Sequence, residues 1–131
     1  MTSSIPPSPN RGEIWTVRFD PSIGAEIQKI RPAAVVNVPE YGRLPLRIVV
    51  PLTDWKPEYA ALPWFVPVYS SPMNSLAKDS GADAFQVKSV ACGRFLMRLG
   101  RLTDAELESI IAAIILCIDS PPKQEPSTSV D

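Results

Sequence analysis

The side chains best suited to chemistry on a phosphodiester lie in one short stretch of the chain, residues 24–32 (GAEIQKIRP). The stretch offers Glu26, Gln28, Lys29 and Arg31, and it ends at a proline that precedes an apolar run. The planar guanidinium of Arg31 can donate paired hydrogen bonds to a phosphate, which a lysine cannot do. A solvated loop with an exposed Arg–Glu pair explains the same spacing, so the residue types alone leave both interpretations open.

Further candidate side chains stand in or beside apolar runs elsewhere in the chain. Thr53 ends the run RIVVPLT, where its hydroxyl could donate to a phosphoryl oxygen or simply belong to a strand. Gln86 and Lys88 are two residues apart in AFQVKS, which places both on one face if this segment is a strand. There they could contact a base and a phosphate, although an exposed polar face explains them equally well. Trp55 could stack on an unpaired base of a single-stranded RNA.

The composition narrows the possible chemistry. The 131-residue chain contains no histidine, which excludes a Ser-His-Asp triad, a histidine-based ribonuclease and most zinc sites. Its two cysteines, Cys92 and Cys117, lack metal-ligand spacing and are predicted to be reduced thiols. We therefore expect neither a metal nor a cofactor. Because the net charge is −1, any RNA partner must be held by a local basic patch.

The two ends of the chain differ in composition from the part between them. Residues 1–10 (MTSSIPPSPN) and 120–131 (SPPKQEPSTSVD) are rich in Ser and Pro and are predicted to be disordered tails. The folded domain is expected over residues 11–119. No signal peptide is recognisable, and no apolar run approaches the roughly 18 residues needed to cross a bilayer, so a cytoplasmic location is predicted.

Short apolar runs between turn residues must position the candidate side chains. Alternation and apolar content predict strands over Glu13–Phe19, Ala33–Val38, Arg47–Leu52, Pro63–Tyr69, Ala84–Ser89 and Phe95–Leu99. One helix is expected at the end, where Thr103 and Glu106 have capping-box spacing. Its apolar stripe, expected to pack on the strands, is Leu107, Ile110, Ile111, Ile114, Ile115 and Ile118. The fold class is mainly β with α: a small SH3-like barrel of about five to seven short strands with a C-terminal helix.

The opening of the domain, residues 11–38 (RGEIWTVRFDPSIGAEIQKIRPAAVVNV), resembles the beginning of toxins of the MazF/PemK family. The shared features are a Gly-Glu-Ile-Trp strand, an Asp-Pro, a Gly-x-Glu loop, and Arg-Pro followed by a Val-rich strand. The VVPLT run that ends in Thr53 is similar to the family's next strand. Later segments follow in the family's order: Lys78-Asp79-Ser80, FQVKS at 85–89, Arg94, and the LTDAEL start of the helix.

This resemblance implies the barrel shared by the MazF, Kid and CcdB toxins, paired as a homodimer. It also implies an endoribonuclease that cleaves messenger RNA and is inhibited by a cognate antitoxin. Arg31 and Thr53 fall on the family's catalytic arginine and threonine. Glu26 falls on its loop glutamate, and Gln86 on the glutamine of a later strand. Ile27 departs from the family pattern, which usually has a glutamine there.

RNA cleavage can proceed without histidine because the RNA supplies its own nucleophile, the 2′-OH. Arg31 would stabilise the extra negative charge on phosphorus, and Thr53 would orient a non-bridging oxygen. Glu26 is the only nearby group able to act as the general base, provided that the protein buries it. Arginine is a poor proton donor, so Arg31 or a water that it positions would serve as the acid. The expected products carry a 2′,3′-cyclic phosphate and a 5′-OH.

Two other classes of function remain open. A CcdB-like toxin would inhibit gyrase, but that family has an aromatic C-terminus, whereas this chain ends in SPPKQEPSTSVD. An SH3-like binding module, or an inactivated relative, would pair with an antitoxin without cutting RNA. Loss of RNA cleavage in an Arg31→Ala variant would separate an enzyme from a binding module.

Overall fold

The computed structural model describes residues 7–119 of the chain. The predicted tail over 120–131 and residues 1–6 of the other predicted tail lie outside the described residues. Residues 7–10, which the sequence assigns to the N-terminal tail, contact the domain. Pro9 is buried, and its carbonyl accepts a hydrogen bond of 2.7 Å from Arg47 Nε. The ordered chain therefore begins before Arg11.

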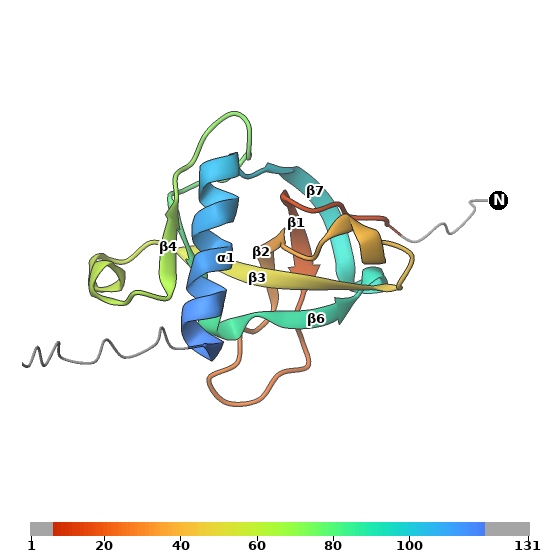
Figure 1. Cartoon of the computed structure of the whole chain (residues 1–131), viewed down its shortest axis with the longest axis horizontal. Coiled ribbons are helices and arrows are strands. Elements are labelled where there is room, and N and C mark those ends of the chain that lie inside the picture. The colour runs from red at the N-terminus through yellow and green to blue at the C-terminus, as the bar shows by residue number, and fades with distance from the viewer. Residues whose placement is uncertain (1–6, 120–131) are drawn as a thin grey trace, which may run out of the picture.

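Seven antiparallel strands form one strongly curved sheet (Figure 1). They are β1 (Glu13–Arg18), β2 (Ile30–Val35), β3 (Leu46–Asp54), β4 (Phe65–Val68), β5 (Ser80–Asp83), β6 (Lys88–Ala91) and β7 (Phe95–Arg101). The strand order is β4-β5-β3-β2-β1-β7, and β6 pairs with β3. The predicted mainly β fold with a terminal helix is confirmed, but the described strands do not close the barrel, because no ladder joins β4 to β7.

The long strand β3 organises the sheet. Its middle pairs with β2, with Ala33 opposite Pro51 and Val35 opposite Val49. On its other edge, the first half of β3 pairs with β6 and its last residues pair with β5. The chain between β5 and β6 therefore turns out of the sheet beside the middle of β3, and that turn contributes to the candidate site.

The predicted strand over Ala84–Ser89 is wrong over its first four residues. Residues Ala84–Gln86 form a single 3₁₀ turn, η3, and β6 begins only at Lys88. The cause lies one residue upstream, where the Asp83 side chain accepts a hydrogen bond of 3.2 Å from the backbone N–H of Phe85. This local side-chain contact competes with the strand ladder. Gln86 and Lys88 consequently do not share a strand face.

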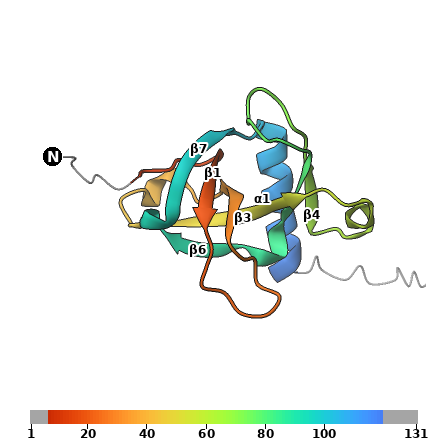
Figure 2. The ribbon, with the colours of Figure 1, turned by 180° about the vertical axis from the view of Figure 1, so that it is seen from behind.

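Helix α1 (Asp104–Ile118) begins with the predicted capping box. Thr103 Oγ1 accepts from the Glu106 N–H at 3.0 Å, and Glu106 Oε1 accepts from the Thr103 N–H at 2.9 Å. The helix crosses one side of the sheet, as both views of the ribbon show (Figures 1 and 2). Its buried face is centred on Ile110 and Ala113.

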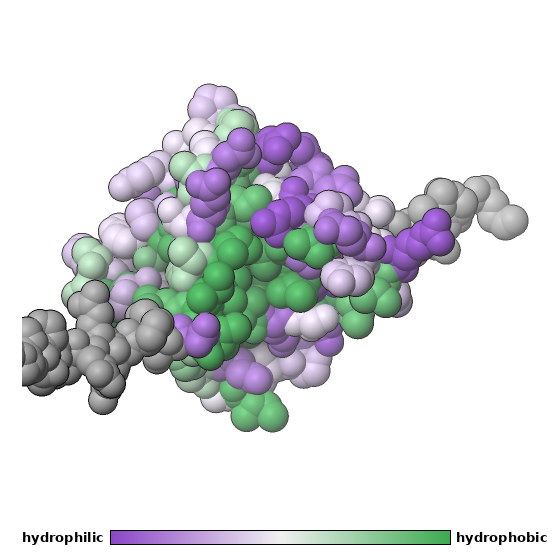
Figure 3. Space-filling model, viewed as in Figure 1, coloured by the Kyte–Doolittle hydropathy of each residue, from purple (hydrophilic) through white to green (hydrophobic). Residues whose placement is uncertain are grey.

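The predicted apolar stripe of α1 is wrong at its end. Ile115 and Ile118 are 51% and 77% exposed, and hydrophobic surface gathers over the helix (Figure 3). Apolar residues occupy every side of the C-terminal half, IIAAIILCI, so their spacing could not define which face is buried.

The sheet separates two hydrophobic clusters. Alternate residues of β2 and β3, such as Ala34 and Val50, face the cluster that contains α1 residues. Their neighbours Ala33 and Val49 face a second cluster on the other side of the sheet. Ile27, from the loop between β1 and β2, is buried in this second cluster. The loop is therefore anchored to the core near the N-terminal end of β2.

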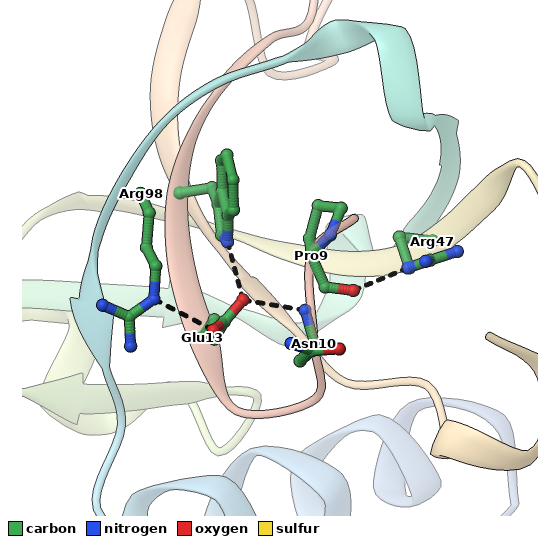
Figure 4. A network of polar contacts seen from close by, with 6 residues as sticks. Pro9, Asn10, Glu13, Arg47 and Arg98 are labelled. Carbon is green, nitrogen blue, oxygen red and sulfur yellow. Dashed lines mark hydrogen bonds and ion pairs between the residues drawn. The ribbon is translucent and has the colours of Figure 1, made fainter. Parts of the chain in front are cut away.

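A polar network fixes the start of the domain (Figure 4). Glu13 accepts hydrogen bonds from Trp15 Nε1 at 3.0 Å, Asn10 N at 2.8 Å and Arg98 Nε at 2.9 Å. Burial by itself would raise the pKa of Glu13, but these three hydrogen bonds outweigh burial and lower it. Nearby, the buried Arg47 guanidinium donates to several backbone carbonyls, those of Pro9, Gly42, Leu44 and Leu46.

Candidate functional site

The register of β2 and β3 brings two predicted site residues together. The ladder between the strands ends with Ala33 opposite Pro51, and Arg31 and Thr53 each lie two residues beyond this pair, at the same end of the two strands. Because side chains alternate along a strand, both lie on the face that carries Ala33 and Pro51. On the other edge of β2, Arg31 lies opposite Val17 of β1. The fold therefore places two side chains from distant sequence positions at the same end of adjacent strands.

Neither of these polar groups has a partner among residues 7–119. Arg31 is exposed, and its guanidinium makes no hydrogen bond or ion pair with the described side chains or backbone. The Thr53 hydroxyl is shielded from solvent and also lacks a hydrogen-bond partner. A buried hydroxyl without a partner costs free energy, so its presence needs a reason. A ligand oxygen would satisfy both groups.

An aromatic cluster borders Thr53 on the opposite side from Arg31. Gly81 of β5 lies opposite Thr53, and the absence of a side chain there admits three rings. A Cβ at Gly81 would stand 3.1–3.2 Å from ring atoms of Phe65, Trp55 and Tyr59. Trp55 packs edge-on against Tyr59, whose ring stacks on Phe65 at 3.8 Å between centroids. The predicted RNA-binding residue Trp55 is thus half-buried in this cluster.

The loop between β1 and β2 carries three further predicted residues, and all three are exposed. Glu26 Oε1 accepts from the Ile23 N–H at 2.7 Å, which closes a turn within the loop. The burial that a general base would need is therefore absent. Gln28 donates to a carbonyl within the same loop, at 3.3 Å. Lys29 has a positive φ of 65°, and its N–H donates to Asp20 at 2.9 Å.

Gln86 ties this loop to the rest of the molecule. Its Oε1 accepts from the Ile27 N–H at 2.6 Å, and its Nε2 donates to the Ala25 carbonyl at 3.3 Å. The same Nε2 donates to Asp83 Oδ2 at 3.3 Å. Both ends of the amide are engaged, so Gln86 holds the loop instead of presenting a free amide to solvent. Its predicted role in binding RNA directly would require these bonds to open.

Asp83 is a residue that the sequence did not single out for chemistry. It is buried, and it lies two residues beyond Gly81 on the face that carries Thr53. Burial raises the pKa of Asp83, although hydrogen bonds from Gln86 and Phe85 oppose the effect. The available signal was an aspartate directly before a turn, since such side chains often accept a hydrogen bond from the second N–H along.

Two cations near the loop serve structure. Arg94 Nη1 donates to the backbone carbonyls of Arg18 and Asp20 at 3.1 and 2.6 Å, which fixes the start of the loop. Lys88 is half-buried, and its Nζ lies 6.0 Å from the centroid of the Phe19 ring. This is the distance of a cation–π contact. Lys88 still lines the hollow beside the loop, so it retains access to a ligand.

Two broader features concern the described part of the chain as a whole. Across residues 7–119, no helix combines the length and the hydropathy that a membrane crossing requires. In the same residues, no three Cys, Asp or Glu side chains gather in an arrangement suited to a metal ion.

Comparisons with known proteins agree with this architecture. A model of the family described as PemK-like, MazF-like toxin of type II toxin-antitoxin system matches residues 10–118. The chain is 35% identical over 115 residues to endoribonuclease MazF9 of Mycobacterium tuberculosis, covering 83% of this chain and 95% of that protein. The expected resemblance is therefore confirmed by sequence.

Solved structures show the same fold. MazF from Deinococcus radiodurans superposes with a TM-score of 0.71 at 21% identity, covering 83% of this chain and 94% of that one. An endoribonuclease in complex with its cognate antitoxin, from a mycobacterial species, gives a TM-score of 0.67 at 18% identity, covering 86% and 97%. With the family model matching nearly all of the described residues, the chain belongs to the PemK-like, MazF-like toxins of type II toxin–antitoxin systems.

Proposed function

We propose that this MazF-like toxin is an endoribonuclease that cleaves single-stranded messenger RNA without a metal ion. The observation that carries the proposal is that Arg31 and Thr53 lie at the same end of the adjacent strands β2 and β3, with neither group satisfied by the described residues. A phosphodiester offers the oxygens that a guanidinium and a hydroxyl bind. The family model and the MazF9 relative support the same activity.

The reaction begins with the RNA's own 2′-OH. A bond forms between O2′ and phosphorus, and the bond from phosphorus to O5′ breaks. The products carry a 2′,3′-cyclic phosphate and a 5′-OH. Arg31 binds the non-bridging oxygens as negative charge accumulates, an effect worth about 3 kcal/mol for one preorganised donor. Because the Thr53 hydroxyl is shielded in the free protein, adjacent side chains shift when it contacts the phosphate.

In the protein without RNA, the groups that transfer protons are not yet in place. Glu26 accepts the 2′-OH proton, which requires its carboxylate to leave the Ile23 N–H and become desolvated by the bound RNA. A water positioned by Arg31 delivers a proton to the departing O5′, since the guanidinium itself holds its protons too tightly. Gln28, Lys29 and Lys88 supply local positive charge or hydrogen bonds to the RNA backbone, and Trp55 offers an aromatic edge.

The same proposal includes the partners of the toxin. We expect a cognate antitoxin to inhibit the chain, as the family description implies. We also expect a homodimer acting in the cytoplasm, where messenger RNA is found. Ile115 and Ile118 leave hydrophobic surface uncovered in the single chain, which supports a protein partner of some kind. Light scattering of the purified chain measures whether it is a dimer.

The activity is tested by incubating the purified chain with a pool of long single-stranded RNAs in EDTA and mapping the new ends. A second substrate then carries a single 2′-deoxy nucleotide at the mapped cleavage site. The proposal predicts cleavage of the all-ribose RNA and none at the deoxy position, because the nucleophile is missing. Intact RNA throughout the pool would instead direct attention to gyrase inhibition or to a binding role.

A further inference from the structure

A hollow of about 240 Å³ lies between the loop that carries Glu26 and the turn that follows β5. One wall is formed by loop residues, and the other by η3 and the start of β6. The lining residues are Glu26, Ile27, Phe85, Gln86, Val87 and Lys88. The two Gln86 hydrogen bonds to the loop, at 2.6 and 3.3 Å, hold the walls together. The hollow is therefore already formed before any ligand binds.

Phe85 is the unusual member of this lining. Its side chain is 67% exposed, although it belongs to a turn fixed by the Asp83 side chain. The Trp64 ring meets it edge-on, with 6.1 Å between centroids, so one neighbour limits its orientation. Contact between an aromatic ring and water contributes little favourable free energy. A ring that is exposed and held in one orientation presents a flat face on which another flat group can stack.

The position of the hollow relates it to the cleavage residues. Its first wall leads directly into β2, where Arg31 stands. Its second wall follows β5, where Gly81 is opposite Thr53 and Asp83 lies two residues further along. Two residues of a strand span about 7 Å. The hollow therefore adjoins the start of β2 and the end of β5, and an RNA bound at Arg31 and Thr53 extends toward it.

We propose that this hollow is a nucleobase subsite in which the Phe85 ring stacks on one base of the RNA and Gln86 positions the two walls. This proposal rests on the proposed RNA cleavage, and it assigns part of the sequence preference of that cleavage to the hollow. A nucleobase matches the lining because it has apolar faces and polar edges. The face stacks on Phe85, while Lys88 offers a donor to the edge.

The test uses four variants and an oligonucleotide that contains the cleavage site of the wild-type chain. Phe85→Ala removes the ring, Phe85→Leu keeps an apolar side chain without a flat face, and Phe85→Tyr keeps the ring. Tyr41→Ala is the matched control, because Tyr41 is 64% exposed and follows the opposite end of β2. Steady-state kinetics give kcat and KM, and sequencing of cleaved ends gives the site preference.

We expect Phe85→Ala and Phe85→Leu to raise KM by about 5- to 150-fold, with a smaller change in kcat, because stacking on an aromatic ring contributes to binding. Phe85→Tyr and Tyr41→Ala should behave like the wild-type chain. In a 2′-deoxy oligonucleotide with 2-aminopurine at the stacked position, fluorescence should be quenched by the wild-type chain and recovered with Phe85→Ala. Thermal unfolding should be the same in all variants, since Phe85 is exposed.

The proposal is overturned if Phe85→Leu matches the wild-type chain in KM and site preference, because an apolar side chain would then suffice. It is also overturned if Phe85→Ala leaves RNA kinetics unchanged while weakening a protein complex, which would assign the ring to a protein partner. Either result leaves the nuclease itself intact. By contrast, a wild-type chain that cleaves no RNA would remove the proposed function, and the two failures are therefore distinguishable.

Discussion

Each end of the central strands carries an arginine and a carboxylate. The hydrogen bonding of the arginine and the direction of the carboxylate's pKa shift differ between the two ends. Where β1 and β3 begin, Arg47 is buried and its guanidinium donates to four backbone carbonyls. Glu13 at that end accepts three hydrogen bonds, and its pKa is lowered. Where β2 begins and β3 ends, Arg31 has no partner among the described residues, and burial raises the pKa of Asp83.

This contrast distinguishes a scaffold from a site. Polar groups that are satisfied within the chain stabilise it, and buried groups that are left unsatisfied reduce its stability. A protein tolerates that cost where a ligand provides the missing partners. The shielded Thr53 hydroxyl, next to an unpaired Arg31, follows this rule. Substitutions at each end test whether the two ends differ in this way.

The largest effect is expected from Arg31→Ala. The variant should lose about a hundred- to a thousandfold in RNA cleavage rate, because a preorganised donor to the transition state is removed. Its unfolding free energy should stay within about 0.5 kcal/mol of the wild-type value, since Arg31 is exposed and unpaired. Single-turnover kinetics and urea denaturation measure the two quantities. An Arg31→Ala variant that unfolds would show that the residue belongs to the scaffold.

Arg47→Ala should show the reverse pattern. Removing the guanidinium leaves buried carbonyls without donors, and we expect a loss of about 3 kcal/mol in unfolding free energy. Arg47→Lys should recover only part of it, because an ammonium cannot reach carbonyls in several directions. Urea denaturation measures the loss. If the fraction that remains folded cleaves RNA more slowly than the wild-type chain, Arg47 contributes to cleavage as well as to stability, and the two ends do not have separate roles.

Two strand threonines provide a matched pair of smaller effects. Thr53→Val removes a hydroxyl that lacks a partner and should raise the unfolding free energy by about 1 kcal/mol while lowering cleavage about tenfold. Thr16 Oγ1 accepts from Met97 N at 3.1 Å, so Thr16→Val should instead destabilise the fold by about 1 kcal/mol and leave cleavage unchanged. Stability changes of the same sign in both variants would contradict the proposed difference.

The smallest effects concern pH. The raised pKa of Asp83 means that its stabilising contribution is complete below the ordinary aspartate pKa and is lost as pH rises through the folded-state pKa. Asp83→Asn should therefore be more stable than the wild-type chain at neutral pH, and the difference should disappear in acid. The lowered pKa of Glu13 has the opposite sign, so its contribution is present at neutral pH and is lost as pH falls.

Glu13→Gln should accordingly be less stable than the wild-type chain at neutral pH, with a difference that also disappears in acid. Denaturation of both variants between about pH 3 and pH 7 measures the two profiles. If Asp83→Asn and Glu13→Gln change the unfolding free energy in the same direction at neutral pH, the two carboxylates do not differ as described.

The sequence predicted the features that depend on local patterns. The capping box at Thr103 is one, and the strand that carries Thr53 is another. Placing Arg31 beside Thr53 required the register of two strands, and only the family resemblance could associate these residues beforehand. Their assignment as catalytic residues stays a prediction.

Other features depend on contacts that no local pattern contains. The AFQVKS segment alternates like a strand, but the Asp83 side chain turns the chain at Phe85. Gln86 and Ile27 are joined across 59 residues, so the engagement of the amide could not be foreseen. The buried face of α1 was ambiguous because apolar residues surround its C-terminal half.

The most direct test of the central claim is to map the ends of RNA fragments produced in EDTA by the wild-type chain and by Arg31→Ala. The site described above predicts discrete fragments with 5′-OH and 2′,3′-cyclic phosphate ends from the wild-type chain, formed about a hundred- to a thousandfold more slowly by a folded Arg31→Ala variant. Fragments with 5′-phosphate ends, or equal cleavage by both chains, would contradict it.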